Sequence, residues 1–414
     1  MIQLPLVDKI RDPVHGFIFL TELEKEIIDS EPFRRLRNIR QLAFTNLVYP
    51  GAEHSRFSHS LGVMEFSSRI FETLMRKDKE LIESRLGWHE DYFVKYWQLI
   101  RLASLLHDIG HAPFSHASED CFEKNYKHED YTRIIIKSEY ISKIIDEYVR
   151  QTGIRHEEVS AFFEKRSVDE NISFLKPIFS GEMDSDRMDY LLRDSLFSGV
   201  GYGRFDYERL IVSLCLVELP ESGNPVIAVE EGGVHALEAL ILARYFMFTQ
   251  VYFHRVRRSL DFHLTRFVQK TIGKYPREVT DFLACDDKYV IDKMKQNPNN
   301  VDSNAILKRL YFRQAFHTEE HCRPEDVVKF LWLKEKVADK FGKENVFFDE
   351  AKNAPHKFEK NDTFVRKEKG EIVKVQSISR LISQLDIIEQ YRIYAARDKR
   401  EEIKKFCDNF KIRS

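Results

Sequence analysis

The sequence predicts a mostly α-helical protein, with a helical core and a smaller C-terminal α+β part. Apolar residues recur at helical spacing over long stretches between about residues 57 and 273. Short β-prone runs occur only near the start, at 216–231 and at 340–375. Hydrophobic residues make up 43% of the 414 residues, which is enough to bury a substantial core.

The N-terminal elements follow from local signals. Pro13 and Gly16, followed by FIFL, predict a turn and a short extended segment. Thr21 and Glu24 have the spacing of a capping box, so a helix is expected from residue 21 onward. Further helices are expected at 57–77, 92–111 (stopped near Pro113), 128–150, 155–166, 184–197, 207–215, 234–273, 276–297 and 302–315.

The later elements are more mixed. Two short apolar runs around PESGNP predict a β-hairpin at 216–231. Residues 340–375 are charged and contain NVFF, TFVR and IVKV, which predict a small β-containing subdomain. The stretch from SISRL to CDNF is expected to be helical again.

Charge and composition argue against several classes of protein. The chain has 65 basic and 67 acidic residues, so nucleic-acid binding is not expected as its main role. No apolar run reaches the roughly 18 residues of a membrane span, and the N-terminus lacks the pattern of a signal peptide. The 5 cysteines are scattered without a CxxC pair, which indicates free thiols. A cytoplasmic protein is therefore expected.

The stretch LLHDIGHAPFSH concentrates histidine and aspartate within an apolar run. On a helix, His107, Asp108 and His111 could all project toward one side. His107 and Asp108 could then bind one cation together, which would offset the several kcal/mol that burying an unpaired carboxylate costs. Alternatively, Asp108 pairs with an arginine and His107 is a hydrogen-bonded core histidine.

Two other stretches carry residues of the same kinds. AEHSRFSHSLGVMEF places Arg56 and His59 at the start of an apolar helix. GEMDSDRMDYLLRDS places Asp186, Tyr190 and Asp194 at positions i, i+4 and i+8, which form a polar stripe on one helical face. Such a stripe alone is more often a solvated face, but here it accompanies two histidine-bearing helices.

Taken together, these motifs resemble the HD-domain metal-dependent phosphohydrolases. DPVHGFIFL, FRRLRNIRQL, YPGAEHSRFSHSLGV, LLHDIGHAPFSH and MDSDRMDYLLRDS follow the order and approximate spacing of the deoxynucleoside triphosphate (dNTP) triphosphohydrolases. The resemblance runs from about residue 9 to 407 and includes no SAM domain. It implies an HD-type phosphohydrolase domain at 1–275, with a C-terminal helical and α+β region at 276–414 packed on it.

The resemblance also implies a metal site. The family's four ligands match His59, His107, Asp108 and Asp186. One divalent ion per site is expected. Mixed nitrogen and oxygen ligands suit Fe, Mn, Zn, Ni or Mg equally well, and Mg²⁺ could also accompany the nucleotide.

Catalytic and substrate-binding residues are implied in the same way. His111 and His128 match the family's catalytic histidines, and Glu119 would orient His111 for proton transfer. The residues matched to phosphate and sugar contacts are Gln41, Arg56, His116, Arg187, Tyr190 and Asp194. Gln41 and Asp194 match the pair that binds the sugar 3′-hydroxyl, and Tyr190 matches the ring that disfavours a 2′-hydroxyl. The implied reaction converts a dNTP to deoxynucleoside and triphosphate.

One segment departs from the family pattern. In MFTQVYFHRVRR and the serine that follows it, Val251 and Ser259 occupy the places of an arginine and a tyrosine of the nucleotide pocket, and Tyr252, His254, Arg255 or Arg257 could substitute. The departure leaves other readings open. One is an HD-type phosphohydrolase for nucleoside monophosphates, cyclic nucleotides or ppGpp-like nucleotides; another is a non-catalytic nucleotide sensor. The expected partners are a dNTP or related nucleotide and, in a homodimer or homotetramer, further copies of the chain.

Overall fold

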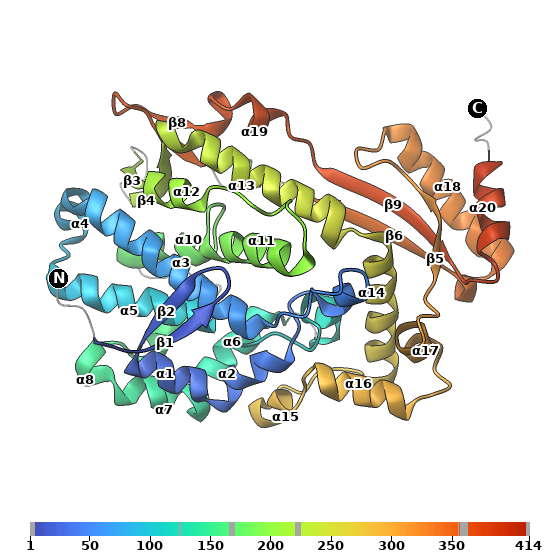
Figure 1. The fold of residues 1–414 in the computed structure, drawn as a ribbon, viewed down its shortest axis with the longest axis horizontal. Helices are drawn as coiled ribbons and strands as arrows, with labels where there is room; N and C mark the ends of the chain where they lie inside the picture. The colour runs from blue at the N-terminus through green and yellow to red at the C-terminus, as the bar shows by residue number, and fades with distance from the viewer. Residues whose placement is uncertain are drawn as a thin grey trace.

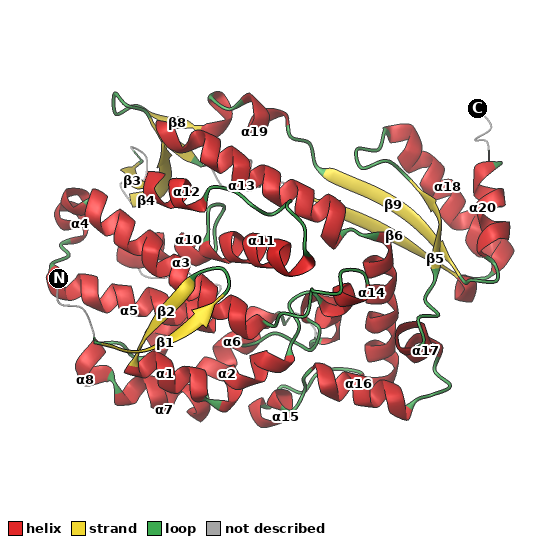
Figure 2. Ribbon diagram, viewed as in Figure 1, coloured by secondary structure: helices red, strands yellow, loops and turns green. Residues whose placement is uncertain are grey.

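Helices form the body of the molecule, and the strands gather in small sheets (Figures 1 and 2). The computed structural model describes residues 5–123, 126–164, 170–219, 225–354, 356 and 363–410. The helices of its first half are α1 (Glu22–Asp29), α2 (Glu31–Arg35), α3 (Arg56–Lys77), α4 (Lys79–Leu86), α5 (Glu90–Leu106), α6 (His128–Lys137), α7 (Glu139–Glu147), α8 (Val149–Thr152), α9 (His156–Ala161), α10 (Lys176–Phe179) and α11 (Ser185–Ser198). The mostly α fold class is confirmed.

The second half adds shorter helices and most of the strands. Its helices are α12 (Tyr207–Ser213), α13 (Val234–Met247), α14 (Arg255–Phe267), α15 (Val279–Leu283), α16 (Asp287–Gln296), α17 (Val301–Leu307), α18 (Pro324–Phe341), α19 (Arg380–Gln384) and α20 (Arg400–Asp408). The strands of the whole chain are β1 (Leu6–Asp12), β2 (Gly16–Thr21), β3 (Leu214–Glu218), β4 (Pro225–Glu230), β5 (Arg313–His317), β6 (Val346–Asn353), β7 (Phe364–Arg366), β8 (Ile372–Lys374) and β9 (Ile388–Ala395).

The centre of the fold is α3, which packs against α5 and α11 (Figure 1). Most of its side chains are buried, including Phe57, Leu61 and Met64. Gly62 permits the close approach of α11, because a Cβ atom there would lie 1.9 Å from Asp189 Oδ1. The predicted capping box starts α1: the Thr21 hydroxyl accepts from the Glu24 amide at 3.3 Å, and the Glu24 carboxylate accepts from the Thr21 amide at 3.0 Å.

The strands form sheets of two, four and three strands within the described residues. β1 and β2 make an antiparallel hairpin, and so do β3 and β4, which confirms the hairpin predicted at 216–231. The tip of that second hairpin lies outside the described residues. The runs TFVR and IVKV form β7 and β8, and β7 pairs in parallel with β4. NVFF begins β6 in a different sheet, so the β-prone residues at 340–375 do not form a single subdomain.

Several helical predictions in the second half of the chain are wrong. The C-terminal stretch contains β9, the central strand between β5 and β6, and the helix expected at 302–315 gives way to β5 after Leu307. β9 is buried along most of its length and therefore lacks the polar alternation that identifies a strand in sequence. The helix expected at 234–273 is interrupted by a π-helical turn at Phe248–Tyr252, a feature frequent at functional sites.

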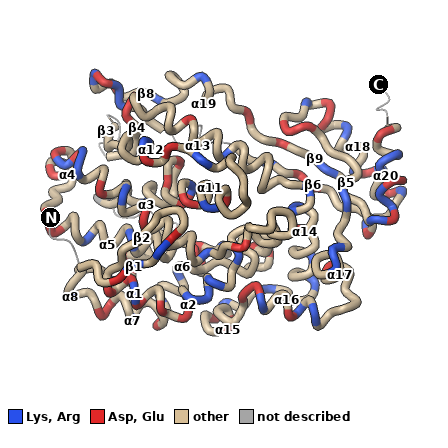
Figure 3. The backbone as a smooth tube through the Cα atoms, viewed as in Figure 1, with Lys and Arg blue, Asp and Glu red and all other residues tan. Residues whose placement is uncertain are grey.

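Charges of both signs are interspersed along the whole chain (Figure 3). No helix in the described segments is long and apolar enough to cross a membrane.

Candidate active site

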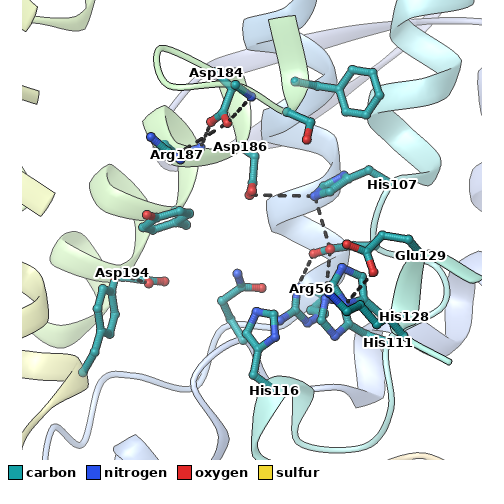
Figure 4. A pocket seen from close by; sticks show the side chains of 18 of the residues that line it. Arg56, His107, His111, His116, His128, Glu129, Asp184, Asp186, Arg187 and Asp194 are labelled. Carbon is teal, nitrogen blue, oxygen red and sulfur yellow. Dashed lines mark hydrogen bonds and ion pairs between the residues drawn. The ribbon is translucent and has the colours of Figure 1, made fainter. Parts of the chain in front are cut away.

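A cavity of about 980 Å³ opens beside α11, where α5 ends and where the π-helical turn separates α13 from α14. Figure 4 shows predicted site residues pointing into it from opposite walls. The predicted residues that line it are Gln41, Arg56, His107, Asp108, His111, His116, His128, Asp186, Arg187, Tyr190 and Asp194. His59 and Glu119 lie directly behind this lining, in contact with Asp186 and His128.

His107, Asp108 and His111 are brought together by a turn rather than by a helical face, so the helix predicted to reach residue 111 is wrong in its last turn. α5 ends at Leu106, and the His111 amide donates to the Asp108 carbonyl at 3.1 Å. Helix α6 supplies hydrogen-bond partners to the backbone of this turn. The Thr132 hydroxyl donates to the His107 carbonyl at 3.0 Å and accepts from the Gly110 amide at 3.1 Å.

The four predicted metal ligands converge at the end of α5. His59, His107 and Asp108 offer ligand atoms within 4.8 Å of one another. Asp186 completes the group, because its Oδ1 lies 3.0 Å from His59 Nε2 and 3.8 Å from His107 Nε2. Asp108 faces the same two nitrogens at 3.6 and 3.3 Å.

The second ring nitrogen of each histidine is held by the protein. His59 Nδ1 donates to Asp189 Oδ2 at 2.8 Å, and His107 Nδ1 donates to the Ser104 carbonyl at 2.7 Å. Both Nε2 atoms therefore face the two carboxylates as ligand nitrogens. His107 Nε2 is buried and has no hydrogen-bond partner within the described chain. The set fits a divalent cation of mixed nitrogen and oxygen preference, without selecting one metal.

The electrostatics of the group favour positive charge between its carboxylates. Burial lowers the pKa of His59, but hydrogen bonds to Asp186 and Asp189 outweigh burial and raise it to about 10. Burial raises the pKa of Asp108, yet the charges of Arg56, His107 and His111 hold it well below its usual range. The arginine anticipated as the alternative partner of Asp108 is present, since Asp108 forms an ion pair with Arg56.

His111, His116 and His128 meet beside the metal ligands. His111 and His128 stack with ring centroids 4.1 Å apart. Glu119 Oε1 accepts from His128 Nδ1 at 2.7 Å and from His116 Nδ1 at 3.0 Å, whereas His111 Nδ1 is 3.6 Å away and makes no hydrogen bond to it. Glu119 thus orients His128 and His116 in this structure, not His111 as expected.

The electrostatics separate the roles of the two stacked rings. Burial, followed by the charges of Arg56 and His128, holds the pKa of His111 well below its usual range. Burial also lowers the pKa of His128, but its hydrogen bond to Glu119 outweighs that effect and raises it. His111 is therefore neutral, while His128 is the ring that retains a proton.

The opposite wall holds polar groups suited to a sugar. Asp194 Oδ1 accepts from His54 Nε2 at 2.7 Å, and its Oδ2 accepts from the Tyr252 hydroxyl at 2.7 Å. The rings of Tyr190 and Tyr252 are 6.3 Å apart. The side-chain oxygen Oε1 of Gln41 is buried and accepts no hydrogen bond from any described residue. His54 thus supports Asp194 rather than the metal site.

At 251–259, the side chains that face the cavity are not those at the family's two positions. Val251 and Ser259 are fully buried in the core, whereas Tyr252 and Arg257 line the cavity; His254 and Arg255 are not among its lining residues. Arg187 also lines the cavity, but its guanidinium donates to the Glu182 carboxylate at 2.7 and 3.2 Å.

Asp189 was the functional residue that sequence reasoning missed. It is fully buried and accepts from His15 Nε2 at 2.7 Å, from His59 Nδ1 at 2.8 Å and from the Arg193 guanidinium at 2.8 and 2.9 Å. The i, i+4 spacing of Asp189 and Arg193 was a signal for an ion pair on the buried side of α11.

Comparisons with known proteins agree with this architecture. The sequence model of the HD domain matches residues 56–193, and that of the HD associated region matches 205–413. An uncharacterised protein from Methanocaldococcus jannaschii is 32% identical over 406 residues, covering 95% of this chain and 80% of that protein. The solved structure of a hypothetical protein from Aquifex aeolicus matches with a TM-score of 0.82 and 35% identity, covering 97% of this chain and 99% of that one.

A relative with a named activity matches at lower identity. Human deoxynucleoside triphosphate triphosphohydrolase SAMHD1 is 28% identical over 370 residues, covering 79% of this chain and 57% of the human protein. The match to both family models covers the site from Arg56 to Asp186 and continues through the second half of the chain. The chain therefore belongs to the HD-domain phosphohydrolases in which an HD-associated region follows the HD domain.

Proposed function

We propose that the chain hydrolyses deoxynucleoside triphosphates to deoxynucleoside and triphosphate with the help of a divalent metal. One observation carries the proposal. A single cavity has the metal ligands and stacked imidazoles on one wall, and Gln41, Tyr190 and Asp194 on the other. This arrangement suits a substrate whose sugar and α-phosphate are adjacent. The likeness to human SAMHD1 supports the same substrate class.

His59, His107, Asp108 and Asp186 would hold the metal. When bound there, a divalent cation would polarise a phosphoryl oxygen and make a water molecule more acidic. Arg56 lies against Asp108 and carries a guanidinium suited to binding phosphate oxygens. Arg257 lies on the wall around the π-helical turn, where it can neutralise the far end of the polyphosphate.

Proton transfer is assigned to the stacked histidines. His128 keeps a proton because Glu119 accepts from its Nδ1, so its Nε2 proton is available to the departing 5′-oxygen. Neutral His111 stacks on His128, and its Nε2 lies 3.1 Å from Asp108 Oδ1. From there it can orient an attacking water.

The sugar is assigned to the wall of the cavity that carries Tyr190, Tyr252 and Asp194. Asp194 is held by His54 and Tyr252, so its carboxylate is fixed in place before a sugar hydroxyl arrives. Gln41 has an unused carbonyl oxygen that can accept from the same hydroxyl. The ring of Tyr190 would close the face on which a ribose carries its 2′-hydroxyl.

The test is to incubate metal-loaded protein with each dNTP and each ribonucleoside triphosphate, and to identify the phosphorus products by ³¹P NMR. The proposal expects triphosphate from dNTPs, with much slower turnover of ribonucleotides. Asp186→Asn should abolish turnover together with metal binding. Absence of triphosphate from every dNTP, with the metal bound, would refute the proposal.

The replacement of two family residues by Val251 and Ser259 favours a second candidate, an HD-type phosphohydrolase for another nucleotide. Such an enzyme would release orthophosphate or pyrophosphate from a nucleoside monophosphate, a cyclic nucleotide or a ppGpp-like nucleotide. The same product analysis separates the two candidates. Nucleotide binding without turnover would instead indicate a sensor.

A further inference from the structure

The loop between His111 and His116 has an unfavourable backbone conformation. Phe114 and Ser115, two consecutive residues with Cβ atoms, have φ angles of +58° and +60°. Such residues rarely adopt this left-handed conformation unless the surrounding structure imposes it. The loop matters to the site, because the Ser115 hydroxyl accepts from Arg56 Nε at 2.7 Å and donates to the Arg40 carbonyl at 2.8 Å.

The conformation is imposed from outside the HD domain. Asp287, the first residue of α16, is buried with 7% of its surface exposed. Its Oδ1 accepts from the Phe114 amide at 2.6 Å, and its Oδ2 accepts from the Arg40 amide at 3.0 Å. One carboxylate thereby ties the loop that carries His116 to the segment that carries Gln41.

A second contact from the same part of the HD-associated region supports this arrangement. Buried Arg35 donates to the Cys285 carbonyl at 2.6 and 3.0 Å and to the His111 carbonyl at 2.9 Å. The 111–116 loop is therefore tied to residues 285–287 directly at Phe114 and, through Arg35, at His111. These contacts are made by the backbone of His111 and Phe114. The side chains of the loop therefore do not reveal that its conformation depends on residues 285–287.

We propose that Asp287 is a positioning residue of the active site, which holds the Phe114–Ser115 turn and the Arg40 backbone in register so that Arg56, His116 and Gln41 meet one substrate. The HD-associated region would thus complete the site through hydrogen bonds to backbone. The effect on turnover rests on the proposed function, whereas the effect on the two amides does not.

The test compares Asp287→Asn with Asp286→Asn. Asparagine at 287 presents one oxygen and one NH₂ group, so one of the two amides would face a donor instead of an acceptor. Asp286 is the N-cap of the same helix and accepts only from the Tyr289 amide among the described residues, a role that asparagine can keep. The two variants therefore make the same substitution one residue apart.

Hydrogen exchange gives the readout that does not depend on activity. With Asp287→Asn, peptides covering 38–42 and 111–118 should exchange faster, while metal content and exchange elsewhere match the wild type. In the dNTP assay, kcat should fall by about 10²-fold, the scale expected for a displacement of about 1 Å, with a smaller change in KM. Asp286→Asn should match the wild type in both measurements.

If Asp287→Asn does not fold, Asp287→Ser serves in its place, because the serine side chain is too short to bond both amides and its hydroxyl can rotate so that no donor is held against them. Equal exchange in both segments for the 287 and 286 variants would overturn the proposal. So would a loss of kcat that merely follows a global loss of stability. A wild type that turns over no dNTP would refute the proposed function, and the exchange experiment would still decide the role of Asp287.

Discussion

Asp189 supports the predicted metal centre from behind, although it is not one of the four predicted ligands. It is fully buried, and Arg193, His15 and His59 hold its pKa well below the usual range despite the opposing effect of burial. Its hydrogen bond to His59 Nδ1 fixes the tautomer in which Nε2 carries the lone pair. We therefore expect the metal affinity of the site to depend on this carboxylate behind His59.

We expect Asp189→Asn to weaken divalent-metal binding by about 10- to 100-fold, as is typical when a hydrogen-bond partner of a ligating histidine is changed. Isothermal titration with Mn²⁺ measures the change. Asp206→Asn is the matched control, because Asp206 caps α12 on the surface. Unaltered affinity in Asp189→Asn would show that His59 is oriented by other contacts.

The pair of His128 and Glu119 gives stability a defined pH dependence. Interaction with Glu119 raises the folded-state pKa of His128 above the usual 6.5 of histidine. The stabilisation that comes from protonated His128 is therefore complete below pH 6.5. It is lost as the pH rises through the raised pKa of the folded state. The folded-state pKa of Glu119 is lowered, so its own contribution persists when the pH falls through the usual range of a carboxyl group.

We therefore expect the difference in unfolding free energy between wild type and His128→Gln to be larger at about pH 6 than at about pH 9. Urea unfolding at both pH values measures it. His235→Gln is the control, since the His235 side chain is 96% exposed and solvent screens its contact with Glu238. A difference that grows with pH would contradict the assignment of the proton to His128.

At this scale, the resemblance to the HD-domain family predicted which side chains lie together better than it predicted their hydrogen-bond partners. His59, His107, Asp108 and Asp186, which that resemblance implied as metal ligands, lie close together. Asp189 was missed because its role depends on His15, which is 174 residues away in the chain. Glu119 was expected to orient His111, whereas it accepts from His128, on which His111 stacks; the sequence does not reveal this tertiary contact.

At the scale of elements, the close packing of α6 against the end of α5 places His128 beside His111. Gly110 makes this possible, because a Cβ atom there would lie 2.2 Å from the Thr132 amide nitrogen and 2.3 Å from the His128 carbonyl. Neither contact involves the flexible end of a side chain. The backbone of α6 would have to move to accept any larger residue.

Gly110→Ala should accordingly displace α6, reduce dNTP turnover strongly and destabilise the fold by about 1–3 kcal/mol, as overpacking does. Gly87→Ala is an informative control. Gly87 has φ +65° with open space around its Cα, so alanine should cost about 1 kcal/mol through backbone strain alone and leave turnover unchanged. Thermal unfolding and steady-state rates measure both variants. Equal rates for the two would contradict the packing argument.

Elements with one buried face were predicted well, and elements buried on all sides were not. The capping box of α1 and the β3–β4 hairpin carry local signals that survive in the fold. Strand β9 carries no such local signal, since a buried central strand and a buried helix have similar apolar sequences. The interruption at Phe248–Tyr252 was also invisible, because the apolar pattern continues through it.

At the scale of the whole molecule, one hydrophobic core runs from Ile18 to Ile388 and crosses the expected division at residue 275. The HD-associated region supplies Arg257 and Tyr252 to the cavity and Asp287 to the loops behind it. The division into two regions stays a prediction, as does the homodimer or homotetramer. The cavity, however, depends on both halves of the chain.

The central claim is that water attacks the α-phosphorus of a dNTP in this cavity. The most direct measurement is turnover of a dNTP by metal-loaded protein in H₂¹⁸O, followed by mass spectrometry and ³¹P NMR of the products. We predict unlabelled deoxynucleoside and triphosphate that carries one ¹⁸O atom, both abolished in His107→Asn with its metal site disrupted. Label in orthophosphate, pyrophosphate or the deoxynucleoside would contradict the account.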